Sequence, residues 1–118
     1  MITLVGHGYV GQAIAKNLKK RGILFAWVHH GARWTPSGPI INAAGYTGNP
    51  NVDACENNKH ECMEGNVYWP ILLEEIAGSQ PVIHITSGCV YNGYKEGGFK
   101  ETDEPNFTGS YYSHTKAL

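Results

Sequence analysis

Two groups of residues in this 118-residue sequence have the types and spacing that chemistry requires. The first is a glycine turn that follows a short apolar run and precedes a stretch with helical periodicity, Gly6-His7-Gly8-Tyr9-Val10-Gly11. Glycines in such a turn let the backbone approach a pyrophosphate closely, and the free N–H groups of the following helix hold the anion. The turn predicts dinucleotide binding, with a purely structural turn as the alternative.

The type of dinucleotide depends on the residues about 20 positions after the glycines, where an NAD site usually carries Asp or Glu. Here that zone reads His29-His30-Gly31-Ala32-Arg33 and has no carboxylate. Arg33, with the histidines as weaker helpers, could face a 2′-phosphate, which favours NADP(H) while NAD(H) stays possible. The alternative is that Arg33 is a solvated loop residue.

The second group consists of Tyr112 and Lys116, four residues apart, preceded by Ser87 at the end of an apolar run. On a helix, residues four apart share one face, so the ammonium can lower the pKa of the phenol. Such a Tyr can donate a proton, and Ser87 can hydrogen-bond a substrate carbonyl oxygen. A Tyr-x-x-x-Lys match is common by chance, but its order after the glycine turn strengthens it.

The elements that must position these residues alternate between apolar runs and helical periodicity. The sequence predicts strands at 2–5, 23–28, 40–41 and 82–86, and helices from Tyr9 to Gly22, across 53–77 with interruptions at Gly65 and Pro70, and at 112–118. The 23–28 and 82–86 strands are expected to be buried. This alternation predicts an α/β fold with a Rossmann-type doubly wound parallel sheet, in which ligands bind beyond the carboxyl ends of the strands. Both groups fall at such ends.

Composition excludes several other classes of function. Nine Lys and Arg against ten Asp and Glu leave a net charge of −1, so nucleic acid is not expected as a partner. No segment approaches the roughly 20 apolar residues that span a bilayer, so no membrane partner is expected. Three cysteines make no disulfide framework, which favours the cytoplasm. Cys55, His60, Glu61 and Cys62 match no standard zinc spacing, so no metal is predicted.

Longer segments resemble the extended short-chain dehydrogenase/reductase family, and within it the sugar-nucleotide reductases similar to dTDP-4-dehydrorhamnose reductase. The resemblance covers nearly the whole chain and is strongest to the bifunctional 3,5-epimerase/4-reductases of UDP-rhamnose synthesis. It rests on stretches far more specific than the glycine turn: Asn42-Ala43-Ala44-Gly45, residues 47–53, Ser87-Gly88-Cys89-Val90-Tyr91, and residues 98–116.

The resemblance implies roles for the residues at matching positions. Tyr112 would be the general acid, Lys116 its electrostatic partner and a ligand of the cofactor ribose, and Ser87 the hydroxyl that polarises the carbonyl. Hydride would pass from NADPH to C4 of a nucleotide-linked 4-keto-6-deoxy sugar, the expected substrate. The cofactor site would comprise the glycine turn and the end of the third strand: Gly6, His7, Gly8, Tyr9, Val10, Gly11, Asn42, Ala43 and Ala44.

Cys89 carries the second activity that the resemblance implies. In the bifunctional members the matching residue is an acid/base in epimerisation, and a thiol can do this if its pKa is tuned. Cys89 would then contact the sugar together with Ser87 and Tyr112. The alternatives are a reductase with Cys89 as a small buried residue, or a non-catalytic nucleotide-binding or regulatory homologue. A homodimer is possible.

Three departures from the family pattern accompany the resemblance. The turn reads Gly-x-Gly-x-x-Gly, one residue shorter than the usual Gly-x-x-Gly-x-x-Gly, and the segment between Val28 and Ile40 is short. The sequence ends two residues after Lys116, so residues 1–118 are expected to be the NAD(P)-binding part of a longer enzyme, without its substrate-binding part. The alternative is a truncated relative that cannot complete the site.

Two further residues carry expectations of their own. Asn66 matches a helix asparagine that supports the active site in the family, with a surface amide as the alternative. His84 is expected to be a core histidine.

Overall fold

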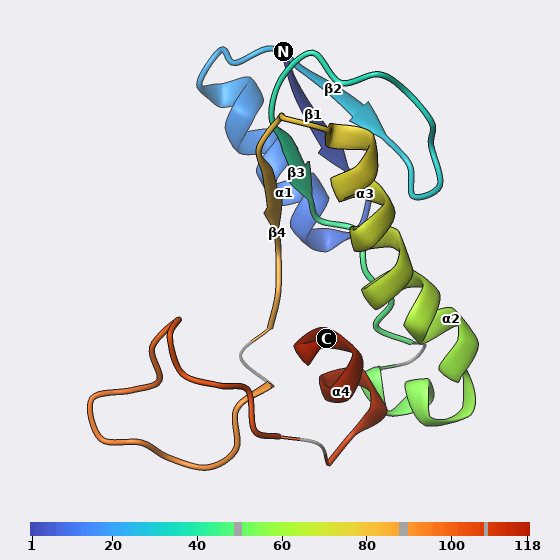
Figure 1. The fold of residues 1–118 in the computed structure, drawn as a ribbon. Helices are drawn as coiled ribbons and strands as arrows, with labels where there is room; N and C mark the ends of the chain where they lie inside the picture. The colour runs from blue at the N-terminus through green and yellow to red at the C-terminus, as the bar shows by residue number, and fades with distance from the viewer. Residues whose placement is uncertain (49–50, 88–89, 108) are drawn as a thin grey trace.

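The computed structural model describes residues 1–48, 51–87, 90–107 and 109–118. Its centre is a parallel sheet of four strands in the order β2-β1-β3-β4 (Figure 1). The strands are β1 (Ile2–Val5), β2 (Phe25–Val28), β3 (Ile40–Asn42) and β4 (Val82–His84). The chain moves outward from β1 to β2 and in the opposite direction from β3 to β4, so right-handed crossovers place their helices on opposite faces. The predicted Rossmann-type doubly wound parallel sheet is confirmed.

Helix α1 (Tyr9–Lys20) follows the glycine turn as predicted. Its buried side is formed by Gly11, Ala15 and Leu18, and Lys19 and Lys20 in its last turn complement the negative end of the helix dipole. The helix stops before Gly22, whose φ of +68° is a conformation that glycine adopts without strain.

The 53–77 region is helical with a change of pitch rather than a break. It contains the 3₁₀ segment η1 (Val52–Asn57), α2 (Lys59–Met63), the π-helical segment η2 (Glu64–Tyr68) and α3 (Trp69–Ala77). The main helix begins next to Pro70, as predicted. The wider π turn just before Pro70 is compatible with a residue that has no N–H and whose ring crowds the preceding turn.

Two strands that the sequence predicts as buried lie at the edges of the described sheet. The residues of β2 are all half-buried and Leu24 lies outside the strand, while Ile83 in β4 is 55% exposed. The buried core lies instead on the central strands, where Leu4, Val5 and Ile40 are fully buried. The prediction of burial was wrong because an apolar run does not reveal how many neighbours its strand has.

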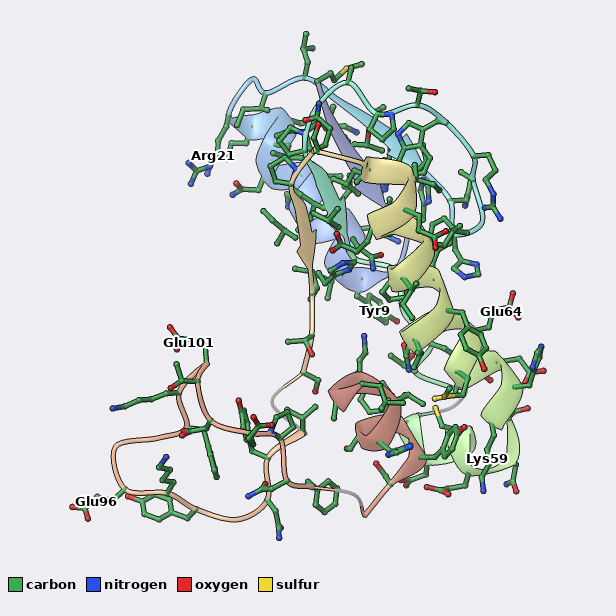
Figure 2. The ribbon with its side chains drawn as sticks, viewed as in Figure 1. Tyr9, Arg21, Lys59, Glu64, Glu96 and Glu101 are labelled. Atoms are coloured by element: carbon green, nitrogen blue, oxygen red, sulfur yellow. The ribbon has the colours of Figure 1, made fainter. Side chains whose placement is uncertain are left out.

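The C-terminal part places a short helix beyond the sheet. Helix α4 (Tyr111–Ala117) lies past the carboxyl ends of the strands (Figure 1). Its N-cap is Ser110, whose Oγ accepts a hydrogen bond from the backbone N–H of Ser113. Residues 90–107 form a loop that projects away from the sheet, and the side chains of Glu96 and Glu101 point outward from it (Figure 2).

Within residues 1–48, 51–87, 90–107 and 109–118, no helix combines the length and the apolar character that crossing a bilayer requires.

Candidate active site

A cleft of about 540 Å³ opens at the carboxyl ends of β1, β2 and β3. Its walls come from the glycine turn, from the segments after β2 and β3, and from α2 and η2. The lining residues are 6–8, 29–30 and 43–46, together with Glu61, Glu64 and Gly65. The position agrees with the expectation that ligands of such a sheet bind beyond its strand ends.

The three glycines of the turn have different physical reasons to be glycine. Gly6 has a φ of +106°, and a Cβ there would lie 2.8 Å from the Ala44 nitrogen. A Cβ at Gly11 would overlap the carbonyl oxygen of Gly6. Gly8 differs, because its φ of −77° suits any residue and a Cβ there would meet nothing within 4 Å. Gly6 and Gly11 are therefore required by the fold, whereas the bare backbone of Gly8 leaves room for a ligand.

The other residues of the turn divide between the cleft and the outside. Tyr9 is 95% exposed and, with Val10, lines a shallower groove along α1. The ring of His7 lines the cleft, stacked between Trp27 at 4.4 Å and His29 at 4.0 Å between ring centroids. Burial and the neighbouring His29 lower the pKa of His7, which favours the neutral form of the ring.

The segment after β2 brings its histidines, and not its arginine, to the cleft. His29 and His30 are lining residues. Arg33 is exposed, and its Nη1 donates hydrogen bonds to the carbonyl oxygens of Gly31 at 3.0 Å and Ala32 at 3.3 Å. Its guanidinium is thus held by its own loop.

The segment after β3 forms the opposite wall. Ala43 and Ala44 line the cleft, and Asn42 lies behind them with a 2% exposed side chain. The Ala43 N–H donates to the Val5 carbonyl oxygen at 2.9 Å, and the Ala44 N–H donates to Asn42 Oδ1 at 3.1 Å. These bonds hold the wall against β1 and the glycine turn.

Helix α4 brings Lys116 to the rim of this cleft. A Cβ built at Gly45 would lie 2.9 Å from Lys116 Nζ, so the ammonium rests against the Gly45 backbone. The same Nζ lies 6.0 Å from the ring centroid of Tyr112, as expected for residues one helical turn apart. Burial lowers the pKa of Lys116, and the nearby Cys62 opposes that shift.

The remaining predicted catalytic residues lie around this helix and beyond β4. Tyr112 is buried, and its ring packs with Cys55 and Cys62. Ser87 is half-buried beyond the end of β4. Both residues make interactions within the fold. Cys89 lies outside the described residues.

Asn66 in η2 ties the cleft wall to α4. Its Oδ1 accepts the Tyr46 N–H at 2.8 Å, and its Nδ2 donates to the Tyr46 carbonyl oxygen at 2.9 Å. The same amide donates to Thr115 Oγ1 at 3.1 Å and to Cys62 Sγ at 3.4 Å. Asn66 is 7% exposed, so the alternative of a surface amide is wrong.

Comparison with known proteins agrees with this geometry. The chain is 45% identical over 87 residues to the bifunctional dTDP-4-dehydrorhamnose 3,5-epimerase/dTDP-4-dehydrorhamnose reductase of Arabidopsis thaliana, an alignment covering 67% of the chain and 29% of that protein. It is 34% identical over 129 aligned positions to a trifunctional UDP-glucose 4,6-dehydratase/UDP-4-keto-6-deoxy-D-glucose 3,5-epimerase/UDP-4-keto-L-rhamnose-reductase of the same plant, covering 94% of the chain and 19% of that protein.

The chain belongs to the extended short-chain dehydrogenase/reductase family. It spans less than a third of the length of these two relatives. No protein-family model matches it.

Solved structures show the same fold over the whole of this short-chain dehydrogenase/reductase segment. The UDP-glucose 4-epimerase of Thermus thermophilus, complexed with NAD, matches with a TM-score of 0.76 and 20% identity, over 99% of this chain and 48% of that one. RMD from Pseudomonas aeruginosa, complexed with NADPH, matches with a TM-score of 0.70 and 20% identity, over 98% of this chain and 45% of that one.

Two features of this family member escaped prediction from the sequence. Trp27, interpreted as a packing residue, donates from Nε1 to the Gly6 carbonyl oxygen at 2.7 Å. His84, expected in the core, instead pairs with Glu74 at 2.8 Å and is partly exposed. Both partners are distant in sequence, so no local signal indicated either contact.

No metal centre is formed by the part of the chain that the structure describes, because its His, Cys, Asp and Glu side chains nowhere gather in threes around one point. Cys55 and Cys62, both buried, instead pack together beneath Tyr112. Burial and the neighbouring Cys62 raise the pKa of the Cys55 thiol to about 12.

Proposed function

We propose that residues 1–118 are the NAD(P)-binding part of a reductase that acts on the C4 ketone of a nucleotide-linked 4-keto-6-deoxy sugar. The observation that carries the proposal is the meeting of two predicted groups at one cleft. The side-chain-free Gly8 faces its open space, and the Lys116 ammonium sits at its rim against Gly45. The first suits a pyrophosphate, and the second suits a ribose hydroxyl and an ionising phenol.

The residues of the chain fit a nicotinamide cofactor, which supplies the hydride when bound. Gly6 and Gly8 would accommodate the pyrophosphate against the start of α1. Lys116 would hydrogen-bond the ribose and stabilise the Tyr112 phenolate, which lowers the pKa of the phenol. Ser87 would donate a hydrogen bond to the C4 carbonyl oxygen, and Tyr112 would donate its phenolic proton to that oxygen as the alcohol forms.

The names of the relatives support this reaction class, since the Arabidopsis proteins are named for epimerase and reductase activities on deoxysugar nucleotides. Solved neighbours hold NAD, NADPH and UDP-glucose. We propose NADP(H) over NAD(H), because residues 29–33 contain no carboxylate and His29 and His30 line the cleft. Cysteine usage supports a cytoplasmic location, and the homodimer remains a prediction that sedimentation analysis can check.

The decisive experiment combines the full-length protein with NADPH and either a UDP- or a dTDP-linked 4-keto-6-deoxy sugar. We expect the nicotinamide absorbance to fall with at least one substrate. Tyr112→Phe should abolish the fall, whereas Tyr111→Phe, a matched change one position earlier on α4, should retain it. Cofactor binding without turnover of any such sugar would instead support a non-catalytic nucleotide-binding protein.

A second activity, 3,5-epimerisation, is favoured by the names of the relatives and by the position of Cys89 two residues after Ser87. An acid/base at this site must exchange the C3 and C5 protons of the sugar with solvent. We expect deuterium from heavy water to enter both positions, and Cys89→Ser to suppress this while leaving reduction measurable. A wild-type protein that reduces the ketone without exchange is a reductase only, with Cys89 as a structural residue.

A further inference from the structure

A chain of side-chain hydrogen bonds runs from the surface of α3 to the wall of the cleft. Glu74 Oε1 lies 2.8 Å from His84 Nε2, and His84 Nδ1 lies 3.1 Å from Asn42 Nδ2. Asn42 Oδ1 in turn accepts the Ala44 N–H at 3.1 Å. This series of hydrogen bonds therefore connects three elements, α3, β4 and the end of β3. It ends on Ala44, which lines the cleft.

The donor and acceptor of every hydrogen bond in this series follow from the backbone N–H at its end. A backbone N–H can only donate, so the Ala44 N–H requires the oxygen of the Asn42 amide. The amide NH₂ then points to His84, and Nδ1 must accept from it. In a neutral imidazole the other nitrogen carries the proton, so Nε2–H donates to the Glu74 carboxylate.

His84 is consequently the group that satisfies a buried donor. Asn42 is 2% exposed, and a buried NH₂ without an acceptor is costly. If His84 offered no acceptor, rotation of the Asn42 amide toward water would be favourable. This rotation would break the hydrogen bond from the Ala44 N–H to Asn42 Oδ1. Ala44 matters because it also packs on the glycine turn: a Cβ at Gly6 would lie 2.8 Å from the Ala44 nitrogen.

We propose that His84 is a positioning residue for cofactor binding, which acts through Asn42 to hold the Ala43–Ala44 wall in its binding-competent arrangement. The proposal rests on the proposed function, because the ligand of this wall is the nicotinamide dinucleotide. His84 is not itself among the residues that line the cleft. Its effect on affinity comes from the fraction of molecules in which the wall is correctly placed.

The test measures the Kd of the full-length protein for NADPH and for NADH by calorimetry. His84→Leu keeps bulk but removes the acceptor, and we expect roughly tenfold weaker binding of both cofactors. His84→Gln has a carbonyl to accept and an NH₂ to donate, so it should restore affinity to within about threefold. Arg21→Leu is the control, since Arg21 also makes a side-chain hydrogen bond, from Nε to Asn17 Oδ1, but both residues are exposed and neither lines the cleft.

A readout without cofactor separates this proposal from the proposed function. Loss of the Asn42 contact should speed hydrogen exchange of the Ala44 amide about tenfold in His84→Leu, and not in His84→Gln. If wild type binds neither cofactor, the proposed function fails, and the Ala44 exchange rate still decides the role of His84. Unchanged affinity and exchange in His84→Leu, or equal losses in the Leu and Gln variants, would overturn the proposal.

Discussion

Replacing Gly8 and Gly11 separately by alanine should divide ligand binding from folding within one turn. Alanine adopts the Gly8 φ of −77° without strain, and its Cβ would meet nothing within 4 Å. Alanine is a poorer helix N-cap than glycine, but it also lowers the entropy of the unfolded chain by about 0.4–1 kcal/mol, so the two effects oppose each other. The free energy of unfolding should change by less than about 1 kcal/mol.

Gly11→Ala has the opposite expectation. The new Cβ would overlap the Gly6 carbonyl oxygen, a backbone atom that can move only if α1 shifts away from β1. Overpacking of this kind costs about 1–3 kcal/mol, and the better helix propensity of alanine returns at most about 1 kcal/mol. The variant should therefore unfold at a lower urea concentration with an unchanged m-value.

For cofactor affinity the order is reversed, and Gly8→Ala should have the larger effect. A methyl group on Gly8 would occupy the space into which the pyrophosphate must come, and a misfit of about 1–3 kcal/mol corresponds to a Kd for NADPH roughly 5- to 150-fold higher. The assay is calorimetric titration of wild type and Gly8→Ala beside urea unfolding of all three proteins. A Gly8→Ala protein that binds NADPH as tightly as wild type would refute the placement of the pyrophosphate. A Gly11→Ala protein as stable in urea as wild type would refute the close contact between position 11 and the Gly6 carbonyl oxygen.

Three further predictions concern the buried side chains between the cleft and α4. Asn66→Ala removes the hydrogen-bond partners of both the N–H and the carbonyl of Tyr46, and it should lower the free energy of unfolding, measured with urea, by about 2–5 kcal/mol. Asn58→Ala loses a single hydrogen bond to a carbonyl and should lower it by about 1 kcal/mol. Lys116→Met should abolish ketone reduction without lowering the melting temperature. Burial lowers the pKa of Lys116, so its charge is disfavoured in the folded state and its removal should not destabilise the fold. A lower melting temperature would contradict this. Between pH 9 and pH 12 the Cys55 thiol ionises in the unfolded chain but keeps its proton in the folded one, so the free energy of unfolding should fall as pH rises. Urea midpoints measured across this range should fall less steeply for Cys55→Ala than for wild type.

Much of the fold could be predicted because its signals are local. Helical periodicity between Tyr9 and Gly22 depends on neighbours within a few residues, and α1 formed there. The position of Pro70 predicted where the main helix begins for a similar reason, because proline constrains its own turn. The burial of the 23–28 segment could not be predicted in this way, because burial depends on whether a second strand pairs with β2.

The candidate site shows the same division more sharply. The order of glycine turn, strand-end Ser87 and Tyr112-x-x-x-Lys116 is a property of the sequence, and the parallel topology brings the turn and Lys116 to one end of the sheet. The sequence could not show that His29 and His30, and not the Arg33 side chain, line the cleft, because the loop decides where each side chain points.

The sequence by itself therefore determined the family, the order of the elements and the residue types available for chemistry, since these follow from local spacing along the chain. Only the tertiary structure decided which glycine the fold requires and which one faces open space. Gly8 and Gly11 are identical in sequence terms, and the difference lies in a carbonyl oxygen that packing places beside one and not the other. It also brought Asn66 to Tyr46 and His84 to Asn42, because each of these hydrogen bonds joins residues at least 20 positions apart.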